Sequence, residues 1–247
     1  MTVRVGTASD VGLKRAQNED HFTVWSPGEP ESQARGTLLV VADGMGGAMA
    51  GEVASQLAVE CVLEHYRSSQ NGIVDDLRVA IETANRVIHE HSRSHAELRG
   101  MGTTCTAVVV RGADAYFAHV GDSRAYLVQK GAIRQITQDH SLVAQLVEHR
   151  HITPEQAKVD PRRNVVTRSV GVGAEVEVDT GQLDEPLSPG DALVLCSDGL
   201  HGLVEDREIA RLVGRADPDR ACQDLVELAN QRGGTDNITV VIGRMEG

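Results

Sequence analysis

The feature that most constrains the fold is a run of four short strand-like stretches between residues 103 and 137. Each is rich in β-branched or aromatic residues, and only short turns that contain Gly112, Gly121 and Gly131 separate them. Parallel neighbours need a crossover of about a dozen residues or more, so strands this close must pair antiparallel. The predicted strands cover residues 103–110, 113–120, 124–129 and 132–137. This meander spacing disfavours a doubly wound parallel sheet.

Helical periodicity dominates two other stretches. Apolar residues recur at helical spacing over residues 52–66 and 73–91, which predicts two amphipathic helices that pack on a sheet. Residues 27–36 contain two prolines and two glycines and are expected to form a loop. Further strands are predicted at 2–8, 21–25, 38–42, 175–183, 191–197 and 237–242, and further helices from about residues 141, 153, 206 and 217. No internal repeat or long linker interrupts the pattern, so we expect one domain over residues 1–247.

Composition and charge limit the partners of the chain. The hydrophobic fraction of 40% allows a sizeable core, and because aromatic residues make up only 2%, that core must be aliphatic. The net charge of −12 argues against non-specific binding to nucleic acid or to anionic membranes, since both require a basic surface. We therefore expect neither a nucleic-acid nor a membrane partner.

The cysteines and the N-terminal residues predict the compartment. The four cysteines are far apart in the sequence and form no C-x-x-C pair, which is typical of reduced thiols in an intracellular protein. The first residues lack the apolar region of a signal peptide, and no apolar run reaches the length of a membrane span. We therefore expect a cytoplasmic location.

Three aspartates lie at the ends of predicted buried strands. Asp43 follows the apolar run 38–42 and is itself followed by three glycines among four residues. Asp198 follows the run 192–197, and Asp236 directly precedes the last strand. Glycines beside a carboxylate allow the backbone to approach a ligand closely. The three strand ends therefore indicate a functional site.

Carboxylates of this kind suit Mg²⁺ or Mn²⁺, because hard oxygen ligands select such ions, whereas zinc usually recruits His or Cys. Neither His119 nor His140 has a partner at ligand spacing, so the predicted metal is bound by oxygen. Two cations can share one bridging Asp and hold a water between them, and they depress the pKa of that water. Such a site suits in-line attack on phosphorus, with Arg15 available as a bidentate clamp on the phosphate oxygens.

The glycine-rich turn after Asp43 also invites two nucleotide-binding alternatives. A dinucleotide fingerprint needs G-x-G-x-x-G, but Met49 occupies the place of the third glycine. A Walker A loop needs Gly-Lys-Ser/Thr, which does not occur there. Both alternatives are disfavoured.

Residues 141–170 break the strand pattern. Ser141 begins a short helical stretch, and Thr153-Pro154-Glu155-Gln156 has the residues of a capping box with proline at the first helical position. A basic turn follows at residues 160–164. The segment is interpreted as a mobile insertion over the site, with a plain helical connector as the alternative.

Six short motifs follow one another along the chain. They are Arg15-Ala16-Gln17-Asn18-Glu19-Asp20, Asp43-Gly44-Met45-Gly46-Gly47, Gly102-Thr103-Thr104, His119-Val120-Gly121-Asp122-Ser123-Arg124-Ala125-Tyr126, Ser197-Asp198-Gly199-Leu200 and Gly234-Thr235-Asp236-Asn237-Ile238-Thr239. In this order they resemble the PPM (PP2C) family of metal-dependent Ser/Thr protein phosphatases. The resemblance spans nearly the whole chain, and the Met-Gly-Gly form of the second motif resembles the bacterial branch.

The resemblance implies an α+β fold, a four-layer α-β-β-α sandwich of two antiparallel sheets flanked by helices. It also implies that Asp43 bridges two Mn²⁺ or Mg²⁺ ions and that the carbonyl of Gly44 joins it on one of them. Asp198 and Asp236 would hold the other ion, and Asp20 would orient metal-bound water or ligate directly.

The same resemblance implies further roles. Asp122 with Asp198 would form a weaker third-metal site, and residues 141–170 match the flap of the family. Asn237 would position the carboxylate of its neighbour. Two residues depart from related proteins: Ala48 stands where many bacterial relatives carry His, and Met45 stands where some eukaryotic members carry a His that could donate a proton. Metal-bound water or another group would then protonate the leaving oxygen.

The activity implied is hydrolysis of phosphoserine and phosphothreonine in proteins, by attack of a water that bridges the two ions. The expected partners are phosphorylated proteins, including a eukaryotic-type Ser/Thr kinase that the phosphatase opposes and the substrates of that kinase, and the chain is expected to act as a monomer. Two alternatives stay open: a phosphoprotein-binding pseudophosphatase, and a regulatory phosphatase with a single dedicated substrate.

Overall fold

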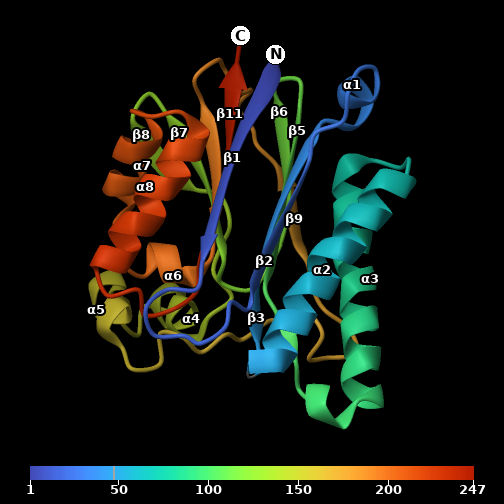
Figure 1. Cartoon of the computed structure of the whole chain (residues 1–247), viewed down its shortest axis with the longest axis vertical. Coiled ribbons are helices and arrows are strands. Elements are labelled where there is room, and N and C mark those ends of the chain that lie inside the picture. The colour runs from blue at the N-terminus through green and yellow to red at the C-terminus, as the bar shows by residue number, and fades with distance from the viewer. Residues whose placement is uncertain (47) are drawn as a thin grey trace.

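Two antiparallel sheets face each other, and helices cover both outer faces in the computed structural model, which describes residues 1–46 and 48–247 (Figure 1). The strand orders are β1-β11-β10-β7-β8 in one sheet and β2-β3-β5-β6-β9 in the other, with β4 paired to β3. The fold is therefore α+β with four layers, and the prediction of a flanked sandwich is confirmed. Gly47 lies outside the described residues, as does the side chain of Ala48.

The strands of the two sheets alternate in groups along the sequence. The first sheet contains β1 (Thr2–Asp10), β7 (Arg124–Gln129), β8 (Ala132–Gln135), β10 (Ala192–Cys196) and β11 (Ile238–Glu246). The second sheet contains β2 (Asp20–Trp25), β3 (Thr37–Met45), β4 (Gly102–Thr103), β5 (Cys105–Arg111), β6 (Asp114–Val120) and β9 (Asp179–Gln182). The first and last strands pair along their whole length, so the two ends of the chain lie side by side (Figure 1).

The two predicted amphipathic helices form the outer layer over the second sheet. They are α2 (Ala48–Ser68) and α3 (Ile73–Ser94). The layer over the first sheet consists of α7 (Asp206–Val213) and α8 (Pro218–Gln231). The shorter elements are α1 (Glu31–Arg35), η1 (Ala96–Leu98), α4 (Leu142–Glu148), α5 (Pro154–Val159) and α6 (Asp198–His201). No helix in the described ranges is long and apolar enough to cross a membrane.

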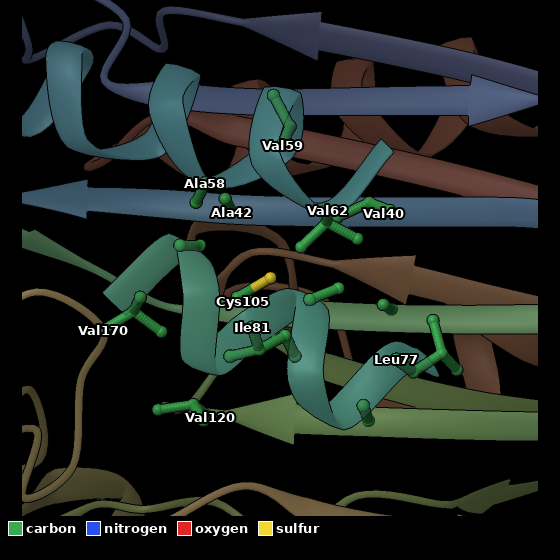
Figure 2. Close-up of a cluster of buried hydrophobic side chains, with 14 of the residues drawn as sticks. Val40, Ala42, Ala58, Val59, Val62, Leu77, Ile81, Cys105, Val120 and Val170 are labelled. Atoms are coloured by element: carbon green, nitrogen blue, oxygen red, sulfur yellow. The ribbon is translucent and has the colours of Figure 1, made fainter. Parts of the chain in front are cut away.

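Three hydrophobic layers hold the sandwich together, and strand β3 contributes to two of them. Leu38 and Val40 point outward to α2 and α3, a packing shown in part in Figure 2, while Leu39 and Val41 point into the space between the sheets. Successive side chains of a strand lie on opposite faces, and here both faces are covered. This explains why the run 38–42 is apolar throughout and fully buried.

The meander prediction is correct for two of its three connections and wrong for the third. β5 pairs with β6 and β7 pairs with β8, both antiparallel. β6 and β7 belong to different sheets, because the chain crosses the sandwich at Gly121–Ser123 instead of forming a hairpin. Gly121 has φ +112°, and a Cβ there would lie 2.5 Å from the Thr104 side chain, so the close crossover requires glycine.

Several predicted boundaries shift. The strand expected at 175–183 is only β9 (Asp179–Gln182), and the loop expected at 27–36 contains the short helix α1. The single strand expected at 103–110 is interrupted at Thr104, whose backbone and side chain bond Asp43 instead. The capping box of α5 is confirmed by hydrogen bonds in both directions between Thr153 and Gln156. Three of the cysteines are buried and Cys61 is partly exposed, and all four are free thiols.

Candidate active site

A cavity of about 360 Å³ opens at the end of the sandwich where β3 ends. The structure brings all but one of the predicted site residues to its wall: Arg15, Asp43, Gly44, Asp122, Asp198 and Asp236. The remaining one, Asp20, lies directly opposite Asp43 in the pairing of β2 with β3. Residues from five different parts of the sequence therefore meet at one end of the two sheets.

The backbone of Asp43 is held by two threonines of the neighbouring strand. Its N–H donates to Thr104 Oγ1 (2.9 Å), and its carbonyl accepts hydrogen bonds from the Thr103 hydroxyl (2.9 Å) and the Thr104 N–H (2.9 Å). These contacts satisfy the backbone polar groups of Asp43 and hold the residue in place. Its side chain lines the cavity.

Gly44 is required by the close approach of three chain segments. A Cβ at this position would lie 2.1 Å from the carbonyl oxygen of Gly51 and 2.7 Å from that of Glu19. The Gly44 N–H donates to the Glu19 carbonyl (3.1 Å), which fixes the turn against β2. Any side chain here would push α2 away from the site.

Asp20 is almost fully buried behind the cavity wall, with 4% of its surface exposed. Its Oδ2 accepts a hydrogen bond from the Ser197 hydroxyl (2.7 Å), while no described residue bonds Oδ1. Burial raises the pKa of Asp20 to about 7, against the lowering effect of the nearby Ser197 and Thr239 hydroxyls. A buried carboxylate with one unpaired oxygen is incomplete in the protein alone.

Asp198 and Asp122 lie in connections at one end of the first sheet, the one directly after β10 and the other just before β7. Asp198 begins α6 directly after β10, and burial together with nearby Asp236 raises its pKa to about 6. Asp122 lies in the crossover between the sheets, and burial together with Asp198 raises its pKa to about 7. The Asp122 carbonyl accepts a hydrogen bond from His201 Nε2 (3.0 Å), which joins the crossover to α6.

Asp236 and Arg15 form an ion pair at the opening of the cavity. Arg15 Nη2 lies 2.8 Å from Asp236 Oδ2, and this hydrogen bond raises the pKa of Arg15. The neighbouring Asn237 bonds the Asp236 carboxylate as predicted, but it does so through its backbone. Its backbone N–H donates to Asp236 Oδ1 (2.9 Å), while its side-chain amide bonds the backbone of Glu19, Val11 and Gln17.

Mutual repulsion is the main electrostatic property of the site. The pKa of Asp43 is raised well above its ordinary value, first by burial and then by the charges of four neighbours, Asp20, Asp198, Asp122 and Asp236. A cluster of oxygen donors that repel one another is the environment that a hard divalent cation stabilises. The residues present therefore fit Mn²⁺ or Mg²⁺.

The carboxylates do not form a closed cage as they stand. Across residues 1–46 and 48–247, no three His, Cys, Asp or Glu side chains come close enough together to hold one ion. Asp236 is paired with Arg15 and Asp20 with Ser197, and the remaining carboxylates repel one another. The predicted ligands therefore lie around one cavity, but they are farther apart than the ligands of a single bound ion.

Sequence reasoning missed several residues at the cavity. Thr104 holds the Asp43 backbone, and Ser197 bonds Asp20. Both residues belong to the six motifs, but the sequence assigned no role to either hydroxyl. Glu19 also lines the cavity, and burial raises its pKa. Asn164 and Val166 line the cavity from the segment 141–170, which was predicted to lie over the site.

Comparison with known proteins reveals one family. The model of the protein phosphatase 2C family matches residues 15–237, which is most of the chain. The chain belongs to the protein phosphatase 2C family. A serine/threonine phosphatase stp of Listeria monocytogenes is 36% identical over 240 residues, covering 95% of this chain and 92% of the relative.

Two solved structures of the same family have the same architecture over nearly all of both chains. The serine/threonine phosphatase PstP/Ppp of Mycobacterium tuberculosis matches with a TM-score of 0.88 and 37% identity, covering 100% of both chains. The catalytic domain of serine threonine protein phosphatase PstP in complex with two manganese ions matches with a TM-score of 0.85 and 36% identity, covering 99% of both chains. The resemblance read from six motifs is confirmed.

Proposed function

We propose that this chain is a metal-dependent protein Ser/Thr phosphatase that hydrolyses phosphoserine and phosphothreonine in proteins. The observation that carries the proposal is the group of carboxylates whose charges act on Asp43 beside the cavity. Membership of the protein phosphatase 2C family and the two manganese ions of the PstP structure support it.

The metal ligands are those that the resemblance to the protein phosphatase 2C family implies, and their carboxylates lie at or beside the cavity. Asp43 would bridge two Mn²⁺ or Mg²⁺ ions, with the Gly44 carbonyl on one of them. Asp198 and Asp236 would complete the other, and Asp20 would ligate or orient water. When bound, two such ions activate a water for attack on phosphorus and offset the negative charge of the phosphate. A weaker third ion would use Asp122 together with Asp198.

Arg15 would bind the phosphate of the substrate. Its guanidinium lines the cavity, and half of the side chain is exposed, so it can turn towards an incoming anion. A guanidinium fits two phosphate oxygens at once. Transfer of Arg15 from Asp236 to the phosphate would leave the Asp236 carboxylate available as a ligand.

Protonation of the leaving oxygen cannot involve Met45, because its thioether on the cavity wall carries no acidic proton. We assign this step to a water molecule in the cavity. The side chain of Ala48, the second residue that departs from relatives, lies outside the described part of the chain.

The segment 141–170 would act as a flap over the substrate, within one catalytic domain that spans residues 1–247. Its start is anchored by His140, which donates its backbone N–H to the Gly121 carbonyl (2.7 Å) and accepts the Gly121 N–H at Nδ1 (3.0 Å). His140 Nε2 lies 3.1 Å from Asp179 Oδ2. The Thr167 N–H donates to the His140 carbonyl (2.8 Å), so the stretch that carries Val166 is connected through His140 to the crossover that carries Asp122.

The partners would be phosphorylated proteins, among them a Ser/Thr kinase whose action the phosphatase reverses and the substrates of that kinase. We propose that the chain acts as a monomer in the cytoplasm. A pseudophosphatase would bind the same phosphoproteins without cleaving them, and a dedicated regulatory phosphatase would cleave only one.

The proposal is tested by measuring phosphate release from a phosphothreonine peptide. The three conditions are added Mn²⁺, a chelator, and Mn²⁺ restored after the chelator. We expect release with Mn²⁺, loss of release with the chelator and recovery on restoration. Full activity in excess chelator would contradict the metal-dependent mechanism. Tight peptide binding without release under all three conditions would support the pseudophosphatase instead.

A further inference from the structure

A cluster of buried hydroxyl groups lies behind Asp20. Ser197 stands at the end of β10 and Thr239 near the start of β11, and both are fully buried. Ser9 near the end of β1 adds a third hydroxyl, 2.8 Å from that of Thr239. Strands β1 and β11 and the end of β10 therefore place three hydroxyl groups in one cluster behind the Asp20 carboxylate.

The hydrogen-bond directions at Ser197 follow from its neighbours. The Thr239 N–H donates to Ser197 Oγ (3.0 Å), which occupies a lone pair of the hydroxyl. The hydrogen of the hydroxyl then has two possible acceptors, Asp20 Oδ2 at 2.7 Å and the Asn237 carbonyl at 3.4 Å. A short bond to a carboxylate is much the stronger of the two.

The backbone of Asp20 is tied to the same cluster. Its N–H donates to Asn18 Oδ1 (3.2 Å), and Asn18 Nδ2 donates to Ser9 Oγ (2.9 Å). Ser9 in turn contacts Thr239, whose N–H bonds Ser197. The two ends of the Asp20 residue, its amide and one carboxylate oxygen, are therefore fixed by one connected network.

The second carboxylate oxygen is left without a partner. Asp20 Oδ1 is buried, and no described residue donates to it. Buried oxygens are normally satisfied, so this one requires a partner from outside the protein. Because Ser197 holds Oδ2, Oδ1 is the oxygen of Asp20 that a divalent ion or its water can use.

We propose that Ser197 is a positioning residue for the metal centre. Its hydroxyl bonds Asp20 Oδ2 and so keeps the carboxylate oriented with Oδ1 available to the ion or its water. This inference rests on the proposed metal-dependent function. Partners of this kind, one step removed from the ion, typically change metal affinity about 10- to 100-fold when they are removed. Without the hydroxyl, both oxygens of Asp20 lack a partner and the carboxylate can rotate.

Calorimetric titration of Mn²⁺ into metal-free protein, without substrate, tests this role. We expect Ser197→Ala to bind at least one Mn²⁺ about 10- to 100-fold more weakly than the native chain. The matched control is Ser92→Ala, which removes another buried hydroxyl, one that accepts the Gly100 N–H far from Asp20 in the sequence. Its Mn²⁺ affinity should equal that of the native chain.

The outcomes separate the inference from the function. If the native chain binds no Mn²⁺, the proposed function fails. If the native chain binds Mn²⁺ and folded Ser197→Ala binds it equally well, the positioning role alone is overturned, and a lowered melting temperature would then show a structural hydroxyl. Should Ser197→Ala not fold, Ser197→Cys decides, because a thiol keeps the shape but donates weakly, and unchanged affinity there overturns the role.

Discussion

Strand β3 passes through two opposite environments within nine residues. Leu38, Val40 and their neighbours to Ala42 are fully buried among aliphatic side chains, with both faces of the strand covered. Asp43 and Gly44, which follow, are partly exposed at a cavity surrounded by carboxylates. The apolar end of the strand stabilises the fold. The other end brings the Asp43 carboxylate close to other carboxylates, and their repulsion opposes folding.

The difference separates stability from function. Burial and mutual repulsion raise the pKa values of Asp43 and Asp198 above their ordinary range, so the ionised carboxylates are less favourable in the folded protein than in the unfolded chain. A protein keeps such a group where it has a functional use for it. Substitutions at the two ends of β3 should therefore have opposite effects on activity and on stability.

The largest expected effect is on catalysis. Asp43→Asn should lower kcat/KM for a phosphopeptide by about 10²- to 10³-fold or more, as removal of a group that stabilises the transition state does elsewhere. At pH 7.5 the same change should raise the free energy of unfolding of the metal-free protein, because it removes a buried charge repelled by its neighbours. Phosphate release and chemical denaturation measure the two quantities.

Asp75→Asn is the matched control, because it removes a carboxylate whose side chain is 70% exposed on α3. It should change neither quantity appreciably. A loss of stability in metal-free Asp43→Asn equal to that of an ordinary core substitution would contradict the contrast between the two ends of the strand.

The opposite end of β3 should show the reverse pattern. Leu38→Ala should lower the free energy of unfolding by about 3 kcal/mol, because it removes a fully buried side chain from the layer against α2 and α3. Activity per folded molecule should remain that of the native chain. Val159→Ala, at a largely exposed residue of α5, is the control and should change stability by less than about 0.5 kcal/mol. A large fall in the activity of folded Leu38→Ala would show that the two ends are coupled.

The sequence predicts best what depends on nearby residues. The apolar run that ends at Asp43, the helical periodicity over 52–66 and the capping box at Thr153 are patterns within one turn or one strand, and the structure contains each of them. The predicted site residues also meet at one cavity, except that Asp20 lies just behind it, because each stands near a strand end or in a connection at the same end of the sandwich.

What the sequence could not provide depends on contacts between distant segments. A short connection such as Gly121–Ser123 is compatible with a hairpin, and only the packing against Thr104 shows that the chain crosses to the other sheet. The bond from Ser197 to Asp20 and the ion pair of Arg15 with Asp236 join residues far apart in the sequence. The motifs contain these residues, but no local pattern shows which of them contact each other.

The Mn²⁺ affinity of the carboxylates around the end of β3 should also depend on pH. The pKa values of Asp20 and Asp122 are raised to about 7 and that of Asp198 to about 6, chiefly by burial, so these groups are largely protonated at pH 5.5. Mn²⁺ must displace those protons, so its affinity should rise about tenfold per pH unit for each proton displaced and level off above the folded pKa values. Titration calorimetry at pH 5.5, 6.5 and 7.5 measures this slope.

The same raised pKa values determine how the metal-free protein responds to pH. Stability from these carboxyl groups is fully present below their unfolded pKa and is lost as the pH rises through about 6 to 7. Asp20→Asn should reduce both this loss and the pH slope of Mn²⁺ affinity. A Mn²⁺ affinity that stays constant from pH 5.5 to 7.5 would show that protonated carboxyl groups do not take part in binding.

The smallest expected effect concerns residues 141–170, where α5 lacks the burial that supports β3. In the described structure α5 has no buried residue, so its capping box carries much of its stability. Thr153→Ala should cost about 1 kcal/mol and therefore speed amide exchange in α5 several-fold, with little change in global stability. Asp217→Ala removes the cap of α8, which buries six residues against the first sheet, and exchange there should stay limited by global unfolding. Equal acceleration in the two helices would mean that burial does not decide where this fold opens first.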